Sequence, residues 1–183
     1  MGTIGYLKNF IKDPKVASIT PTSRFTIEKV SNHMDFSRDI RVLEFGPADG
    51  VFTNIILEKM SNGSEIAAIE TNNAFVDKLR GIGDKRLSVI HKSVEFIEEI
   101  TTELKWDHVD YVVSGIPFSF LDEEIKERIL SKSANLLSDK GVFLAYQTSK
   151  HLQPHLEKHF KAVNTSMEYR NIPPMCIYCA KNG

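Results

Sequence analysis

Cysteine and long apolar segments are scarce in this sequence. Only Cys176 and Cys179 are present, as a C-x-x-C pair, and a four-thiolate zinc site needs a second pair. The pair lies in the apolar segment CIYCA, so we interpret both as strand residues rather than as a redox motif, which usually opens a helix. No apolar run approaches the roughly 20 residues that span a bilayer, and the N-terminus has no signal-peptide core. We therefore expect a cytoplasmic protein without a transmembrane segment.

An excess of charge is also missing. The 183 residues have a formal net charge of −1, which argues against a strongly basic nucleic-acid binder. The charge is unevenly distributed, because residues 1–41 and residues 150–183 each carry a net charge of +3 around an acidic centre. Either the charge of solvent-exposed faces varies by chance, or both ends of the chain meet an anionic surface such as a membrane.

Two common nucleotide-binding motifs are absent. No G-x-x-x-x-G-K-[ST] occurs, which excludes a P-loop. The dinucleotide fingerprint G-x-G-x-x-G is not met in VLEFGPADGVFT, because Ala48 and Val51 stand where glycines belong. Internal repeats and low-complexity linkers are missing as well, so the length fits one compact domain.

What the sequence does contain is an alternation of strand-like and helix-like segments. The strand-like segments are residues 41–46, 65–70, 87–93, 108–115, 141–147, 162–170 and 175–180, and the helix-like segments are 51–60, 73–82, 94–100, 122–137 and 151–160. This order predicts an α/β, doubly wound, Rossmann-like fold with helices on both faces of a mostly parallel seven-stranded sheet. The last two strands follow each other directly, which predicts a C-terminal antiparallel hairpin. We expect a single domain, with an N-terminal helical segment (1–40) and a core (41–183).

The strand-to-helix bend at residues 46–50 is the main candidate for a ligand site. Gly46 and Gly50 allow a tight turn and a close approach to a ligand, and the helix that follows presents free N–H groups. Glu70 ends the next predicted strand, where a carboxylate can bind both hydroxyls of a ribose. Glu44 repels a pyrophosphate but attracts a cationic group such as the amino group of an amino acid. These features favour S-adenosylmethionine over NAD.

VLEFGPADGVFT resembles the first motif of class I S-adenosylmethionine-dependent methyltransferases. The segments FIKDPKVASITPTSRF, SGIPF and RNIPPM narrow the similarity to bacterial phospholipid N-methyltransferases, whose core is shared with ribosomal RNA adenine dimethylases. The resemblance covers roughly residues 4–180. It implies S-adenosylmethionine as cofactor, a phosphatidylethanolamine-type lipid as substrate, and no metal. The basic ends of the chain place this lipid at an anionic membrane surface. We therefore expect a cytoplasmic protein that is peripheral on the inner membrane face, and the net charge of −1 makes nucleic acid an unlikely partner.

The resemblance assigns cofactor contacts to Ser23, Glu44, Gly46, Pro47, Ala48, Asp49, Gly50, Glu70, Thr71, Ser93, Val94 and Ser114. Two departures from the family pattern affect this set. The family usually has G-P-G-T-G where this chain has Ala48 and Asp49 inside the bend, and an Asp commonly contacts the adenine amino group where this chain has Ser93. We expect weaker cofactor binding, and a non-catalytic S-adenosylmethionine-binding protein stays as an alternative.

The segment SGIPF bears on the methyl acceptor. Adenine-directed enzymes carry [N/D]-x-P-[Y/F] here, and Gly115 has no side chain to accept a hydrogen bond from a planar amine. We expect Gly115 to leave room for a bulkier sp³ amine of a lipid head group and Phe118 to pack against the amine. The candidates that position the amine are Ser114, Gly115, Pro117 and Phe118, with an ordinary loop as the alternative for the last two. RNA adenine methylation stays as an alternative function, and the catalytic residues are unknown.

Two further patterns concern the ends of the chain. Residues 4–12 have apolar side chains on one helical face with Lys8 and Lys12 beside it, which is typical either of a membrane-surface helix or of a helix that covers the core. The residues His151, His155 and His159 share i,i+4 spacing, and we interpret them as a solvated helix face without a metal.

Overall fold

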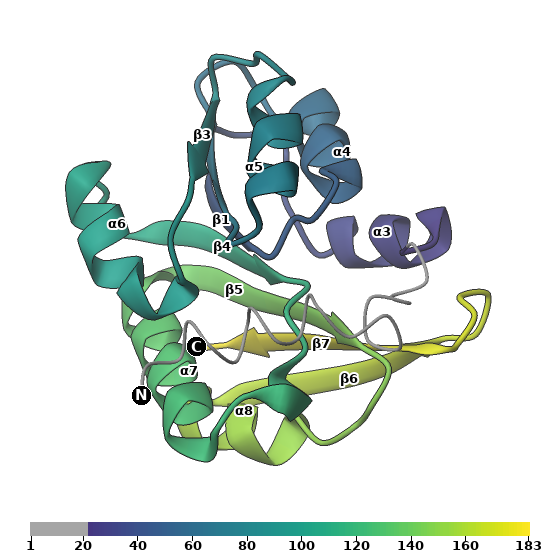
Figure 1. Cartoon of the computed structure of the whole chain (residues 1–183). Coiled ribbons are helices and arrows are strands. Elements are labelled where there is room, and N and C mark those ends of the chain that lie inside the picture. Colours follow the sequence, from purple (N-terminus) through teal and green to yellow (C-terminus); the bar gives the residue numbers. More distant parts are fainter. Residues whose placement is uncertain (1–21) are drawn as a thin grey trace.

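The computed structural model describes residues 22–183, which form one seven-stranded sheet flanked by helices (Figure 1). The strands are β1 (Arg41–Phe45), β2 (Glu65–Ile69), β3 (Leu87–Ile90), β4 (Val109–Ser114), β5 (Leu137–Gln147), β6 (Ala162–Glu168) and β7 (Met175–Lys181). The helices are α3 (Arg24–Ser31), α4 (Val51–Lys59), α5 (Asn73–Arg80), α6 (Ile97–Glu103), α7 (Glu123–Leu136) and α8 (Gln153–His159), with short 3₁₀ turns η1 (Val94–Phe96) and η2 (Phe118–Phe120).

The strand order is β3-β2-β1-β4-β5-β7-β6. The first five strands are parallel, and β7 lies antiparallel between β5 and β6. The predicted doubly wound sheet with a C-terminal hairpin is therefore confirmed. The order reverses between β1 and β4, and in such sheets a ligand binds outside the carboxyl ends of the strands at this switch point.

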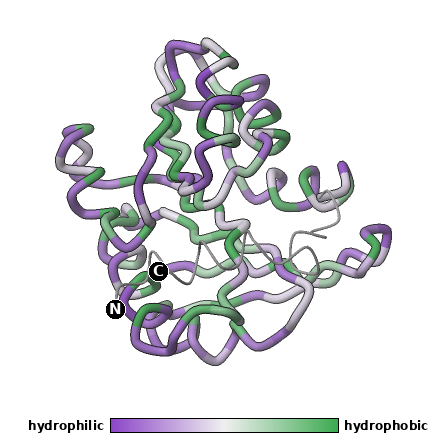
Figure 2. The backbone as a smooth tube through the Cα atoms, in the orientation of Figure 1, coloured by the Kyte–Doolittle hydropathy of each residue, from purple (hydrophilic) through white to green (hydrophobic). Residues whose placement is uncertain are grey.

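Two apolar layers hold the helices on the sheet. Alternate strand residues such as Val42 and Val113 face α3 and α4, whereas Phe45 and Val112 face α6, α7 and α8. Hydrophobic and hydrophilic residues alternate along the helices (Figure 2), as expected for helices with one face on the sheet. The parallel strands are buried on both faces, which explains their nearly continuous apolar sequences.

Several element boundaries differ from the prediction by one to three residues, and the largest difference is at the start of β5. β5 begins at Leu137, directly after α7, rather than at residue 141. Leu137 is buried and pairs with Val109, and the register then shifts before Tyr111, which accommodates the exposed Asp139 and Lys140. Burial of one apolar side chain thus extends the strand across a stretch whose sequence is typical of a turn.

The N-terminal predictions are tested only in part. Ser23 caps α3, where its Oγ accepts a hydrogen bond from Thr26 N at 3.3 Å. The segment Ile4–Lys12 lies outside the described residues, so its interpretation as a membrane-surface helix stays a prediction. Among residues 22–183, every helix is too short or too polar to cross a membrane.

Candidate functional site

The bend after β1 has three residues in the left-handed region. The φ angles are +66° at Gly46, +51° at Ala48 and +81° at Gly50. A Cβ at Gly46 would lie 2.7 Å from the Cγ2 of Ile116, and one at Gly50 would lie 2.9 Å from the Cδ2 of Leu79. The glycines are therefore needed both for their backbone conformation and for close packing, as the sequence predicted for a tight turn.

Ala48 occupies a conformation that favours glycine, and this leads to a prediction. Ala48→Gly should raise the free energy of unfolding by about 0.5–1 kcal/mol, because the left-handed conformation costs an alanine more than glycine loses in chain entropy. Denaturant unfolding measures the change. The matched control is Ala162→Gly in β6, at an exposed residue without a positive φ, where glycine should destabilise. If glycine lowers the stability at both Ala48 and Ala162, the left-handed conformation of Ala48 is not strained.

Glu70 ties the bend to the end of β2. Its Oε1 accepts hydrogen bonds from Thr71 N at 2.7 Å and Asn72 N at 2.9 Å, and its Oε2 accepts one from Ala48 N at 3.2 Å. A carboxylate offers about four acceptor positions, so one on Oε2 stays available for a hydroxyl. The side chain is 8% exposed and is held by these bonds at the edge where the bend lies.

Glu44, the second carboxylate near the bend, is fully buried. Its Oε2 accepts a 2.6 Å hydrogen bond from Thr53 Oγ1, and its Oε1 has no partner within residues 22–183. Burial raises the pKa of Glu44 to about 7, the Thr53 hydrogen bond opposes this shift, and the charge of Glu70 adds to it. Near neutral pH this carboxyl group can therefore change its charge when a cation approaches.

Tyr146 on β5 is a residue that sequence reasoning missed. A Cβ at Gly115 would lie 2.5 Å from the Tyr146 hydroxyl, and the ring stacks on Phe52 of α4 with centroids 5.8 Å apart. The expectation that Gly115 leaves room for a bulky amine is therefore wrong, because the Tyr146 hydroxyl already fills that space. Burial and the negative charges of Glu44 and Asp49 raise the pKa of Tyr146, so the hydroxyl stays protonated and can donate a hydrogen bond.

The contact between Gly115 and Tyr146 is testable by a double-mutant cycle. Gly115→Ala should lower the free energy of unfolding by about 1–2 kcal/mol, because the new methyl group clashes with a ring that Phe52 holds in place. Adding Tyr146→Phe removes the clashing oxygen and should restore part of the loss in denaturant unfolding, with Tyr146→Phe alone as the reference. If the two changes simply add, the hydroxyl does not fill the space at Gly115.

Phe118 does not face the site, contrary to the prediction that it packs against a substrate amine. Its side chain is fully buried in the apolar layer under α7 and meets Phe143 edge-to-face with centroids 6.3 Å apart. Pro117 precedes it as a half-buried loop residue. The alternative, an ordinary loop with one apolar anchor, describes this segment better.

Three buried side-chain oxygens in the described part of the chain lack a hydrogen-bond partner. They are Glu44 Oε1, Ser114 Oγ and Gln147 Oε1. Glu44 stands next to the end of β1, and the other two are the last residues of β4 and β5. Buried polar atoms are rarely left unpaired in folded proteins. All three lie at the carboxyl ends of neighbouring strands, Glu44 on the α4 face of the sheet and the other two on the opposite face. Unpaired acceptors at this edge are typical of a site that a polar ligand completes.

The remaining predicted cofactor residues follow the same edge of the sheet. Ser93 caps η1, where its hydroxyl donates to Glu95 Oε1 at 3.2 Å, and Glu95 in turn accepts a 2.6 Å hydrogen bond from Arg128. Val94 is buried in the apolar layer of α6 and α7, Pro47 is buried in the bend, and Asp49 is exposed. Ser23 lies beside the turn between β6 and β7, where its backbone N–H donates to Asn171 Oδ1 at 2.8 Å.

The three histidines of the last helix region are not a solvated face, so that interpretation is wrong. His155 and His159 are half-buried and contact Glu127 of α7 at 2.7 and 2.8 Å. Burial acts to raise the pKa of Glu127, but hydrogen bonds from Lys158 and the two histidines outweigh it and hold the pKa at about 2. Ligating atoms of Glu123, Glu127 and His155 lie within 4.8 Å of one another, and the lysine partners of both carboxylates make this group an ion-pair network joining α7 to α8.

Two surface hollows of about 260 and 180 Å³ lie elsewhere. The larger is lined by η1, α6 and α7 around Glu95 and Arg128, and the smaller by the end of α5 and by β3. Neither contains a residue of the bend, Glu70 or Tyr146. The unpartnered oxygens at the strand ends therefore mark the candidate site better than these hollows do.

No protein-family model matches the chain. Ornithine lipid N-methyltransferase from Singulisphaera acidiphila is 23% identical over 177 residues, which are 94% of this chain and 92% of that protein. Among solved structures, 1,6-didemethyltoxoflavin-N1-methyltransferase from Burkholderia thailandensis, which contains S-adenosylhomocysteine, superposes with a TM-score of 0.73 at 15% identity over 98% of this chain and 86% of that one.

Precorrin-6y C5,15-methyltransferase from Geobacter metallireducens superposes with a TM-score of 0.72 at 15% identity, covering 91% of this chain and 92% of that one. The fold is that of the Rossmann-like methyltransferases. Within this methyltransferase fold, the bend after β1, Glu70 after β2 and the unpartnered oxygens of β4 and β5 all lie at the carboxyl edge of the sheet.

Proposed function

We propose that this chain is an S-adenosylmethionine-dependent N-methyltransferase that acts on the head-group amine of a phospholipid of the phosphatidylethanolamine type. The observation that carries the proposal is the set of unpartnered buried oxygens at the ends of β1, β4 and β5 in a methyltransferase fold. A lipid N-methyltransferase that is similar over nearly its whole length supports a lipid amine as the acceptor.

The residues of the bend fit the two polar ends of the cofactor. Glu44 Oε1 is buried and unpartnered, which suits the ammonium of the methionine moiety, and the free acceptor position of Glu70 Oε2 suits a ribose hydroxyl. Gly46 and Gly50 let the bend beside these carboxylates adopt its left-handed backbone without a clash with Ile116 or Leu79. Bound S-adenosylmethionine supplies an activated methyl group, so the chain needs no nucleophile or metal of its own.

The task left to the chain is to hold the acceptor amine. Ser114 Oγ and Gln147 Oε1 are buried acceptors without a partner, and they can receive N–H donors from an amine. The N–H bonds of a tetrahedral amine diverge. Two acceptors on neighbouring strands can therefore bind such an amine better than the single planar side-chain amide of an adenine-directed enzyme could. Orienting the lone pair in this way is the main source of rate enhancement that such a site requires.

Methyl-transfer assays with labelled S-adenosylmethionine test the proposal. The full chain is incubated separately with phosphatidylethanolamine vesicles, with RNA and with buffer, and the label is counted in each fraction. Label in the lipid phase is expected. Label in RNA would favour adenine methylation instead, and binding of S-adenosylhomocysteine without any transfer would favour a non-catalytic cofactor-binding protein.

A further inference from the structure

The turn between β6 and β7 exposes a compact apolar surface. Tyr169 is 74% exposed and Ile172 is 80% exposed, the two highest values among the large hydrophobic residues that the structure describes. Pro173 and Pro174 are exposed beside them. Single exposed apolar residues need no explanation, but four within six consecutive residues form a patch that water solvates poorly. We call residues 169–174 the hairpin tip.

The hairpin tip is held in a fixed shape by the residue at its centre. Asn171 is 1% exposed, and its Oδ1 accepts hydrogen bonds from Ser23 N at 2.8 Å and Thr26 Oγ1 at 3.1 Å. Its Nδ2 donates to the carbonyl of Pro173 at 2.8 Å. Because Asn171 points inward and is held by these three hydrogen bonds, its apolar neighbours are turned outward, and docking them costs little conformational entropy.

Basic and aromatic groups surround the hairpin tip. The guanidinium of Arg170 lies 4.2 Å from the centre of the Phe25 ring, and that of Arg24 lies 4.9 Å from it. Glu168 binds Arg170 through two hydrogen bonds of 2.8 Å, so one of the two cations keeps an acidic partner. Lys29 of α3 adds a third cation near the turn, and its Nζ donates a hydrogen bond to the Met167 carbonyl at 2.7 Å. This combination complements an anionic lipid surface.

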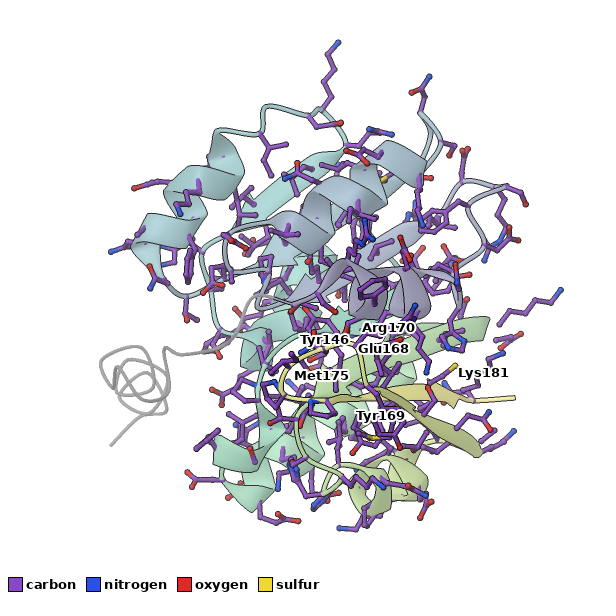
Figure 3. All side chains as sticks on the ribbon, turned by 90° about the vertical axis from the view of Figure 1, so that its right-hand side faces the viewer. Tyr146, Glu168, Tyr169, Arg170, Met175 and Lys181 are labelled. Atoms are coloured by element: carbon purple, nitrogen blue, oxygen red, sulfur yellow. The ribbon has the colours of Figure 1, made fainter. Side chains whose placement is uncertain are left out.

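The hairpin tip lies on the same side of the molecule as the candidate site. β7 is antiparallel to β5, and Cys176 pairs with Gln147, the last residue of β5. Residues 169–174 therefore extend past the carboxyl edge of the sheet, and the turn projects beside α3 (Figure 1). Figure 3 views the molecule from this side, with Tyr169 and Arg170 labelled together with Tyr146.

We propose that the hairpin tip inserts into the head-group region of an anionic phospholipid bilayer and holds the carboxyl edge of the sheet against the membrane. The two prolines have no backbone N–H to desolvate, which reduces the cost of insertion. Tyr169 suits the interface because it has an apolar ring and a polar hydroxyl, and the exposed Arg24 can reach a lipid phosphate. This inference rests on the proposed lipid substrate, since it explains how a lipid amine reaches Ser114 and Gln147.

Vesicle sedimentation tests the hairpin tip independently of catalysis. The full chain should bind vesicles of phosphatidylethanolamine with 30% phosphatidylglycerol, and the double variant Tyr169→Ser with Ile172→Ser should bind about tenfold more weakly. Phe96→Ser is the matched control. Phe96 is a 43% exposed aromatic residue that follows β3, the strand at the opposite edge of the sheet from β6. Its binding should equal that of the parent chain.

A fluorescence measurement asks whether the hairpin tip itself enters the lipid. The chain has one tryptophan, Trp106, which is buried. The additional tryptophan of a Tyr169→Trp variant should therefore report the tip, with a blue-shifted emission that brominated lipids quench. Absence of quenching, or equal sedimentation of the double variant and the parent chain, overturns the inference. So does self-association in solution that the double variant abolishes, which would make the tip a contact between copies of the chain.

The experiments also distinguish an incorrect lipid substrate from an incorrect role of the hairpin tip. If the double variant still methylates phosphatidylethanolamine dispersed in detergent but loses activity on vesicles, both the function and the hairpin tip are supported. If the parent chain binds vesicles through the tip but methylates no lipid, the tip is retained and the proposed function is rejected. Unchanged affinity for S-adenosylhomocysteine in the double variant verifies that the fold is intact.

Discussion

Replacing Glu70 with alanine should weaken the binding of S-adenosylhomocysteine roughly 30-fold, or about 2 kcal/mol. A hydrogen bond to a charged group contributes about 1.5–3 kcal/mol, and one acceptor position of Glu70 is available for a ribose hydroxyl. The substitution also removes the acceptor of Ala48 N, which loosens the bend. Titration calorimetry measures the affinity directly.

The control for this substitution is Glu58→Ala, which removes an exposed carboxylate from α4 without touching the strand ends. Its affinity for S-adenosylhomocysteine should equal that of the parent chain. Glu70→Gln keeps the size of the side chain but replaces one acceptor oxygen with a donor. Its affinity should therefore fall between those of Glu70→Ala and the parent chain. If Glu70→Ala binds as tightly as the control, Glu70 does not contact the ligand.

The affinity for S-adenosylhomocysteine should rise about tenfold between pH 6 and pH 8. The pKa of Glu44 is raised to about 7 by burial, so the carboxyl is mostly neutral at pH 6 and mostly charged at pH 8. Only the charged form attracts the ammonium of the ligand strongly. Glu44→Gln should remove this dependence and bind weakly at both pH values, as calorimetry in matched buffers can measure.

Protein stability should depend on pH in the opposite direction. A glutamate pKa of about 7 in the folded state, against an ordinary value of 4.5, means that the folded chain binds this proton more tightly than the unfolded chain does. The stabilisation is complete below pH 4.5 and is lost as the pH rises through 7, by about 3 kcal/mol. Glu44→Gln should thus stabilise the chain at pH 8 and change little at pH 5.

Denaturant unfolding at both pH values separates this effect from general instability. The Thr53 hydroxyl donates to Glu44, and the amide oxygen of glutamine can accept the same bond. A second variant, Thr53→Val, removes that donor and should raise the pKa of Glu44 further. Equal effects of Glu44→Gln at pH 5 and pH 8 would show that the carboxyl does not titrate in this range.

The sequence by itself determined the elements and the position of the bend. Strand and helix periodicity are local, and burial on both faces gives parallel strands continuous apolar runs, so the alternation of segments predicted the sheet and its terminal hairpin. The positions of Gly46, Gly50 and Glu70 at strand ends follow from the same local pattern. The segment LAYQ (residues 144–147) indicated further site residues in the same way, because Tyr146 and Gln147 end a predicted strand at the same edge of the sheet.

Side-chain directions were decided only by the tertiary structure. Whether Phe118 faced a ligand or the core depended on Phe143 of a neighbouring strand, and whether Gly115 was open depended on Tyr146. The hairpin tip is fixed by a hydrogen bond between Ser23 and Asn171, which are 148 positions apart. Such contacts join residues whose approach is set by the strand order and by packing of the whole chain, and no local pattern in the sequence encodes them.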